Sequence, residues 1–483
     1  MNANTPSNTP RDLTHKETRL VVLGVLLPVF MGSLDNTILA SALPTIGRDL
    51  GDVHSLPWLI TAYLIANTAV TPLYGKISDI HGRRLTLLIA ISTYMVGSLV
   101  CALAPNMLVL ILGRILHGLG GGGLTATGMV ILGDIAAPRD RGRYYGYFSF
   151  AYTTAGACGP ALGGFFAEYL HWSVIFWFNI PMGLIAIALT LTLLRRLPRH
   201  ERPHRLDFIG AALIMAAAVS FMLALNLGGA RYAWTSPSIL ALCAFSLVAG
   251  IGFVVRLSTA PEPLIPISIL ADPVARCAIA VNAFGWGSIV GLNIFLPMYL
   301  QSVIGLSATS AGLSLMVLMV TLNTSAGVSG QLIARVRHYK TVPMLGLVMA
   351  IASVLVLAWQ AENLTLWSFE LLLALIGIGF GATPPLTATA LQNTVAIHHF
   401  GAAVGTMQFS RNLFSTILIA ILGALVLIGT SAGAPSAPPS LSPSAIYDAG
   451  GFVRIFFVAA GSLTIALICL ALLREKPLQT SHT

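Results

Sequence analysis

Long apolar stretches of about 20 residues, separated by short polar loops, constrain the fold of this 483-residue chain more than any other feature. A helix of roughly 20 apolar residues spans a bilayer and satisfies its own backbone hydrogen bonds. The chain is 56% hydrophobic and only 9% charged, with a mean hydropathy of +0.84. A water-soluble domain cannot bury that much apolar surface. The sequence therefore predicts an all-α integral membrane protein.

The apolar pattern predicts fourteen transmembrane helices. Most loops between them are short, and the longer ones fall at 195–206, 257–273 and 430–451. The predicted spans are 20–43, 56–75, 85–104, 107–132, 144–167, 172–194, 207–227, 237–256, 274–301, 309–333, 341–359, 365–391, 403–429 and 452–473.

The basic residues set the expected orientation. Most of the 26 Lys and Arg residues fall in alternate loops and near the termini, whereas Arg48, Arg231 and Arg454 lie on the opposite face. Cytoplasmic loops are enriched in Lys and Arg, so we expect both termini in the cytoplasm and the protein in a plasma or bacterial inner membrane. The net charge of +9 resides in these loops and does not indicate nucleic-acid binding.

Residue types that would indicate an enzyme or a metal site are not grouped in the sequence. The five cysteines fall in or beside apolar stretches without a C-x-x-C pair, which is typical of small packing residues. No nucleophile–base set or cluster of metal-ligating residues stands out. We therefore expect neither catalysis, nor a cofactor, nor a bound metal.

Residues 75–84 form a short, densely charged loop between two predicted spans, with the pattern G-x-x-x-D-x-x-G-R-R. The pattern resembles the signature loop between the second and third helices of the major facilitator superfamily. The resemblance implies that the loop latches two halves of the protein together on the cytoplasmic side, near residues 401–405. The latch would comprise Gly75, Asp79, Gly82, Arg83 and Arg84. The alternative is a solvated basic loop that only sets topology.

A second loop, 330–340, repeats the glycine and the basic residues of this motif but lacks the Asp. Its place predicts two six-helix halves with two helices inserted between them, a layout found in transporters built from repeats. This arrangement resembles the fourteen-helix drug:proton antiporters of the superfamily. The expected divisions are an N-terminal tail (1–19), a first bundle (20–200), two inserted helices (201–260), a second bundle (261–476) and a C-terminal tail (477–483).

Asp35 lies within the first span, in residues 34–44, which resemble the L-D-x-T-I-x-x-x-A-L-P motif of that group. An ionised Asp at the centre of a span costs about 2.5–3.5 kcal/mol or more in lipid. It must therefore face protein, a partner or a watery cavity. One hypothesis is that Asp35 takes up and releases the coupling proton; the other is that it is a structural carboxylate.

Arg114 lies in residues 113–123, which resemble the family's R-x-x-Q-G-x-G motif with His117 where Gln is usual. An arginine inside a span stays charged and needs a carboxylate or several carbonyls nearby. Asp35 is the expected partner, by elimination and by family analogy. His117 either packs and donates hydrogen bonds or titrates, and the glycines that follow predict close helix packing.

Residues 155–164 resemble the G-x-x-G-P-x-x-G-G motif of the superfamily's exporters, which implies antiport. The motif residues are Gly156, Gly159, Pro160, Gly163 and Gly164. A proline removes a backbone donor and bends a helix, while glycines let a neighbouring helix approach closely. Residues 176–181 resemble the F-W-I-N-x-P stretch of the same group. We expect a structural role for them, as an aromatic anchor at the membrane interface and the start of a helix.

Polar residues inside other spans are candidates for a substrate cavity. They are Asn36, His117, Asn282, Asn293 and Arg411. The second half has no clear deep carboxylate, which argues against doubly charged cations as substrates.

The sequence thus predicts a proton-coupled efflux antiporter of small amphipathic or lipophilic compounds that works as a monomer by alternating access. The alternatives are an exporter of one specific metabolite, such as a siderophore or an amino acid, and a non-transporting membrane sensor. An outer-membrane channel and an adaptor protein are further candidate partners, besides the substrate, protons and lipid.

Overall fold

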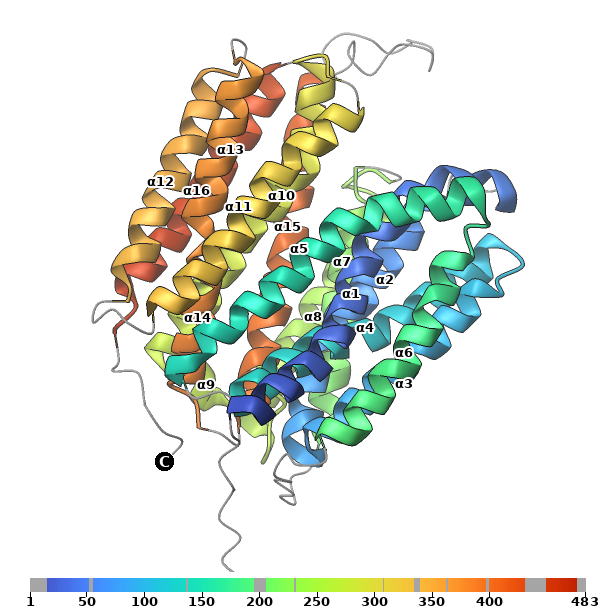
Figure 1. Ribbon diagram of the computed structural model, residues 1–483, viewed down its shortest axis with the longest axis vertical. Helices are drawn as coiled ribbons and strands as arrows, with labels where there is room; N and C mark the ends of the chain where they lie inside the picture. The colour runs from blue at the N-terminus through green and yellow to red at the C-terminus, as the bar shows by residue number, and fades with distance from the viewer. Residues whose placement is uncertain are drawn as a thin grey trace, which may run out of the picture.

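The computed structural model is built from helices throughout its described residues (Figure 1), apart from an isolated bridge between Gly228 and Tyr232. The structure describes residues 15–51, 55–135, 138–194, 206–229, 232–306, 308–333, 339–361, 364–396, 399–430 and 449–475. Both predicted tails and the Ser-, Ala- and Pro-rich part of the 430–451 loop lie largely outside these ranges.

The first half of the chain forms six long helices, and a pair of helices follows. Their bounds are α1 (His15–Leu50), α2 (Leu56–His81), α3 (Arg83–Ala102), α4 (Met107–Ile135), α5 (Pro138–Tyr169), α6 (Val174–Leu193), α7 (Phe208–Leu227) and α8 (Pro237–Thr259). The rest of the chain forms α9 (Ile267–Ala271), α10 (Pro273–Ser302), α11 (Ala308–Ile333), α12 (Thr341–Trp359), α13 (Leu366–Gly381), α14 (Thr383–Gln392), α15 (Phe400–Thr430) and α16 (Ala449–Leu472).

Twelve helical segments among the described residues are long and apolar enough to cross a membrane. Each of the fourteen predicted spans lies on a described helix or helix pair. The predicted spans 56–75 and 144–167 lie on α2 and α5, which are not among the twelve. The all-α membrane fold is therefore confirmed, whereas the count of fourteen crossings stays a prediction.

The helices differ from the predicted spans most clearly at two places. The helix α1 begins before residue 20 and ends after residue 43, because the polar residues at each end of the predicted span continue the helix. The predicted span 365–391 is not one helix: it divides at Ala382 into α13 and α14. Pro384 and Pro385 explain the division, because proline disfavours helical geometry in the residue before it and cannot donate a backbone hydrogen bond.

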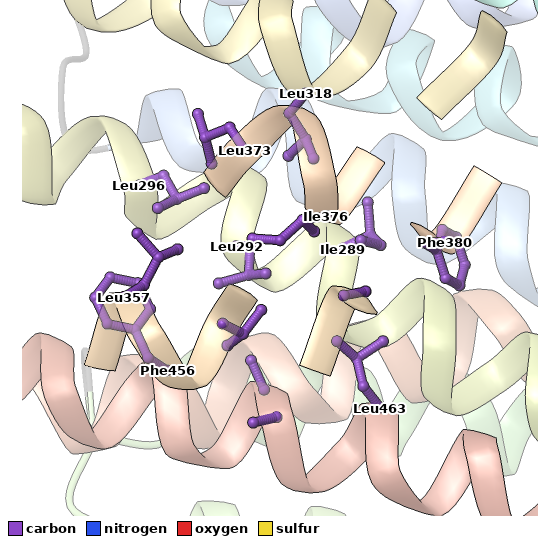
Figure 2. Close-up of a cluster of buried hydrophobic side chains, with 14 of the residues drawn as sticks. Ile289, Leu292, Leu296, Leu318, Leu357, Leu373, Ile376, Phe380, Phe456 and Leu463 are labelled. Atoms are coloured by element: carbon purple, nitrogen blue, oxygen red, sulfur yellow. The ribbon is translucent and has the colours of Figure 1, made fainter. Parts of the chain in front are cut away.

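Each half of the chain has a hydrophobic cluster of its own. One cluster takes all of its buried members from residues 281–470, and another takes all of its buried members from residues 34–176. Figure 2 shows part of the first, where Leu292 and Leu296 of α10 lie close to side chains of α13 and α16. A third cluster joins both halves and includes Tyr74, Tyr144 and Met407. Two helical bundles, with a shared core at one place, thus make up most of the molecule.

The helices α7 and α8 pack against each other, and α7 also contacts α2 and α15. Asp207 begins α7 by accepting from the amide of Gly210 and pairs with Arg256 of α8, with 3.0 Å between Oδ1 and Nε. A small cluster around Ile214 and Phe409 fills the space between α7 and α15. The inserted pair therefore covers one side of the contact between the halves.

The two halves touch near one end and separate toward the other. α5 packs on α11, where a Cβ built on Gly146 would lie 3.8 Å from the Cα of Gly327. Gly164 lies about five turns further along α5, on the same face as Gly146. A Cβ built on Gly164 would meet no atom within 4 Å, and the same is true of Gly312 on α11. The two helices therefore diverge away from the end that holds the α2–α3 turn, as Figure 1 shows.

Candidate functional site

Glycines on α4 let this helix lie against both α2 and α3 without side chains between them. A Cβ on Gly118 would lie 2.5 Å from the carbonyl oxygen of Tyr63 on α2, and a Cβ on Gly120 would lie 2.3 Å from the amide nitrogen of Tyr94 on α3. Only glycine fits at such approaches. The packing expected from the glycine run is therefore present, and it holds the polar residues of α4 inside the first bundle.

Asp35 of α1 and Arg114 of α4 form a buried ion pair within this bundle. The Nη1 of Arg114 lies 2.9 Å from Oδ1 and 2.8 Å from Oδ2 of Asp35. The two side chains are 0% and 2% exposed, respectively. Arg114 also donates from Nε to the carbonyl of Leu59 (2.9 Å) and lies 4.3 Å above the ring centre of Tyr63. The predicted pairing is thus present, because burial leaves each charge with the other as its counter-ion.

His117 completes this group. Its Nδ1 lies 3.0 Å from the Nη1 of Arg114 and 3.5 Å from the Oδ1 of Asp35. A guanidinium can only donate, so Nδ1 accepts and a neutral ring carries its hydrogen on Nε2. That Nε2 is buried without a hydrogen-bond partner among the described residues, and the Tyr94 ring lies 3.9 Å away between centroids. The His117 ring therefore packs against Tyr94 and accepts a hydrogen bond from Arg114. A titrating role of His117 stays a prediction.

The α2–α3 turn lies directly against the start of α15. A Cβ on Gly75 would lie 2.3 Å from the carbonyl oxygen of Gly401, so the two backbones touch. Asp79 accepts hydrogen bonds from the amides of Gly401 (2.9 Å) and Ala402 (2.8 Å). These amides belong to the first turn of α15, where the backbone donors are free and the helix dipole favours an anion. A single carboxylate of the first half thus bridges to the second.

Arg83 holds Asp79 from the opposite side. Its Nη1 lies 2.6 Å from the Oδ1 of Asp79, and its Nε lies 2.5 Å from the Oδ2 of Asp134 at the end of α4. Burial raises the pKa of the Asp79 carboxyl above its usual value, and Arg83 with the two α15 amides opposes that rise. Sequence reasoning missed Asp134. An acidic residue directly after a glycine-rich apolar span was the signal that could have found it.

Among the described residues, the hydrogen bonds of the other two motif residues stay within the first half. Gly82 ends α2 and begins α3 with φ of 84°, a left-handed conformation that favours glycine. Arg84 donates from Nη2 to the carbonyl of Leu191 at the end of α6 (3.2 Å). The grouping of Arg84 with the latch is therefore not supported by its contacts, because its side chain reaches α6 of its own half.

The loop that echoes the motif makes the corresponding contact in the second half. Lys340 donates from Nζ to the carbonyls of Ala471 and of Leu473 (2.8 Å for Leu473) at the end of α16, and its amide donates to Glu475. Arg84 and Lys340 thus each hold the last helix of their own half. Residues 334–338 of this loop lie outside the described residues. The internal repeat predicted from sequence has this structural counterpart.

The glycines of residues 155–164 do not act alike. A Cβ on Gly159 would lie 2.0 Å from the Oγ1 of Thr37 on α1, and Thr37 donates to the carbonyl of Ala155 (3.0 Å). Gly163 is buried, whereas a Cβ on Gly156 would meet nothing within 4 Å. Close packing of α5 on α1 is therefore centred on Gly159. Pro160 lies on α5, but its side chain is outside the described part of the structure, as is that of Asn36.

The polar candidates of the second half do not join the Asp35 group. Asn282 donates to the Oγ1 of Thr387 (3.3 Å), and Asn293 lies 3.7 Å from the sulfur of Met319. Arg411 donates to its neighbour Asn412 (3.3 Å). Asn282 and Asn293 are thus held by partners in their own half.

These features define a multi-pass membrane protein of two helical halves, with an ion pair inside one half and a charged contact between the two. A family model described as the Major Facilitator Superfamily matches residues 25–418. The chain belongs to the major facilitator superfamily.

Known proteins similar to this chain include a bacterial transporter and two solved structures. The multidrug transporter protein MdtP of Bacillus subtilis (strain 168) is 31% identical over 414 residues, which cover 84% of this chain and 75% of MdtP. The human organic anion transporter MFSD10 superposes with a TM-score of 0.68 at 16% identity, covering 94% of this chain and 99% of the other. The proton:xylose symporter XylE superposes with a TM-score of 0.63 at 12% identity, covering 94% and 95%. Transporters with unlike cargo thus share this fold, so the fold does not indicate a substrate.

Proposed function

We propose that the protein is a proton-coupled efflux antiporter of small amphipathic or lipophilic compounds. The observation that supports this most is the buried pair of Asp35 and Arg114. An acidic residue with a single basic partner, deep in an apolar bundle, is suited to bind and release one proton as access to it changes. The chain is also 30% identical over 449 residues to the efflux pump FUS6 of Gibberella fujikuroi, and this similarity supports efflux as the direction.

In this proposal the two halves rock about a site between them, and the α2–α3 end faces the cytoplasm. The contact of Asp79 with α15 would then close the cytoplasmic side, while the divergence of α5 from α11 leaves the outer side open. One proton moving inward across roughly 100 mV releases about 2.3 kcal/mol, to which a pH gradient adds. That free energy can drive outward accumulation of a substrate.

The test is dye uptake into inside-out vesicles that are acidified internally, with the wild type compared with Asp35→Asn. Asparagine keeps a similar shape and one acceptor oxygen but cannot cycle a proton. We expect the substitution to remove most of the pH-driven uptake, measured per amount of protein in the membrane. Equal uptake by the two proteins would contradict the role of Asp35.

The same assay separates the alternatives. An exporter of one metabolite would show competition by a narrow set of compounds, whereas a multidrug exporter would show competition by chemically unlike ones. A sensor would show no pH-driven uptake and would keep its biological effect with Asp35→Asn.

A further inference from the structure

Arg411 lies on α15 where the two halves face each other. Its guanidinium carbon is 5.4 Å from the ring centre of Trp286 on α10. Tyr152 of α5, from the other half, is the titratable group that interacts with it electrostatically. Arg411 and Tyr152 lie deep within the protein, yet both stay partly exposed. Arg411 thus carries its charge deep in the protein, beside a residue of the other half, without being fully buried.

Arg411 has no acidic partner in the part of the chain that the structure describes. Among its 17 acidic residues, Asp35 and Glu370 are the ones placed in the interior of a predicted span. Asp35 is bound to Arg114, and Glu370 accepts from Ser314 (3.2 Å) near the start of α13. No ion pair of Arg411 is found among the described residues. An arginine stays charged in proteins, so this positive charge is uncompensated.

The surroundings of Arg411 are aromatic. Phe414 lies one turn further along the same face of α15, and its ring centre is 4.1 Å from that of Phe284 on α10. The Trp286 ring, in turn, makes an edge contact with Phe380 of α13, with 5.5 Å between centroids. A planar cation beside aromatic faces matches a flat, apolar molecule that bears an anionic group.

We propose that Arg411 binds the anionic group of the exported compound, and that the substrates are aromatic carboxylates or sulfonates. The guanidinium pairs with two oxygens of the anionic group through parallel hydrogen bonds, while Trp286 and Phe414 contact the ring system. This inference rests on the proposed function, since it names the class of compound that the exporter moves. Arg114 cannot serve in the same way, because Asp35 already neutralises it.

The test uses a matched pair of fluorescent probes, a diethylaminocoumarin carboxylate and its carboxamide, which differ in charge at one substituent. Binding is titrated with purified protein in lipid nanodiscs. We expect the wild type to bind the carboxylate about tenfold or more tightly than the carboxamide, as charge-assisted hydrogen bonds do. Arg411→Gln should bind the two probes alike, with its affinity for the carboxamide unchanged. Arg411→Lys should keep a smaller preference for the carboxylate.

The matched control is Arg454→Gln, the same substitution on α16, where the guanidinium donates to the carbonyl of Gly450 in its own helix. It should keep the wild-type preference. Equal binding of the two probes by the wild type, or an unchanged preference in Arg411→Gln, would overturn the assignment.

Transport of both probes into proteoliposomes with an imposed pH gradient tells the two proposals apart. A carboxylate preference in binding without pH-driven movement of either probe would overturn proton-coupled export and retain Arg411 as an anion site. Movement of the carboxamide in preference to the carboxylate would overturn the substrate class and retain export.

Discussion

At the scale of single residues, the charges inside the bundle differ in how they are neutralised. Asp35 and Arg114 form a closed pair with His117 as a third partner. Protein groups supply the hydrogen bonds of this pair directly, so no water molecule is needed to bridge it. The removal of one partner therefore leaves the other charge buried without compensation.

We expect Arg114→Met to lower the stability of the protein by about 3–5 kcal/mol, since it leaves the Asp35 carboxylate unpaired. The double variant Asp35→Asn/Arg114→Met should recover part of this loss, because no charge then remains in the pocket. Thermal unfolding in detergent, followed for the wild type, both single variants and the double variant, measures the coupling. A double variant as unstable as the sum of the two single changes would show that the pair is not coupled.

Asp35 and Arg114 could be paired from the sequence because very few charges occur inside its apolar stretches, so each had few candidate partners. His117 could be placed one turn from Arg114 because the two residues are three positions apart in a predicted helix. Its hydrogen-bond geometry could not be foreseen, because a packed ring has two nitrogens and the sequence does not say which one faces the guanidinium. The role of Asp134 was missed because it follows the predicted span 107–132, and a charged residue outside a span was not examined as a partner.

At the scale of helices, glycines set which elements can touch. α4 lies between α2 and α3, and α2 touches α15, at positions where no side chain would fit. The sequence predicted close packing in α4 from its glycine run, and residues 401–405 were the expected contact of the latch. The division of α13 from α14 was not predicted, because the residues of both helices form one continuous apolar stretch, Leu366–Gln392.

We expect Gly401→Leu to abolish transport. A Cβ at Gly401 would lie 2.3 Å from the carbonyl oxygen of Gly75 and 2.6 Å from the Oδ1 of Asp79, so α2 and α15 could not close. Uptake into vesicles measures the effect, and Gly250→Leu on α8 is the matched control, since a Cβ there meets nothing within 4 Å. Normal uptake with Gly401→Leu would show that this contact does not form during transport.

At the scale of the whole molecule, the two halves meet through few elements. α2 contacts α15, α5 contacts α11, and α7 lies beside the first of these contacts. Figure 1 shows how the bundles spread from there. The sequence predicted two halves from their repeated motif loop. It could not predict how far apart they stand at each end, because that separation depends on contacts between residues far apart in the sequence.

We expect a disulfide between Gly146→Cys and Gly327→Cys to stop transport by fixing the two halves at one end. The backbones approach closely enough for a disulfide, since a Cβ built on Gly146 would lie 3.8 Å from the Cα of Gly327. The five native cysteines are first replaced by serine. Oxidation should inhibit uptake, and a reducing agent should restore it. The single-cysteine variants serve as controls, and unaffected uptake by the cross-linked protein would exclude movement of α5 against α11.

The backbone contact of Gly75 with Gly401 bears on how fast the molecule can change state. Where side chains interlock, two helices separate only after several rotamers rearrange, and the barrier is correspondingly broad. Here two bare surfaces lie against each other, and parting them requires no such rearrangement. Separation at this point does break the two amide hydrogen bonds to Asp79. The rate of opening should therefore respond to the charge on that one carboxylate.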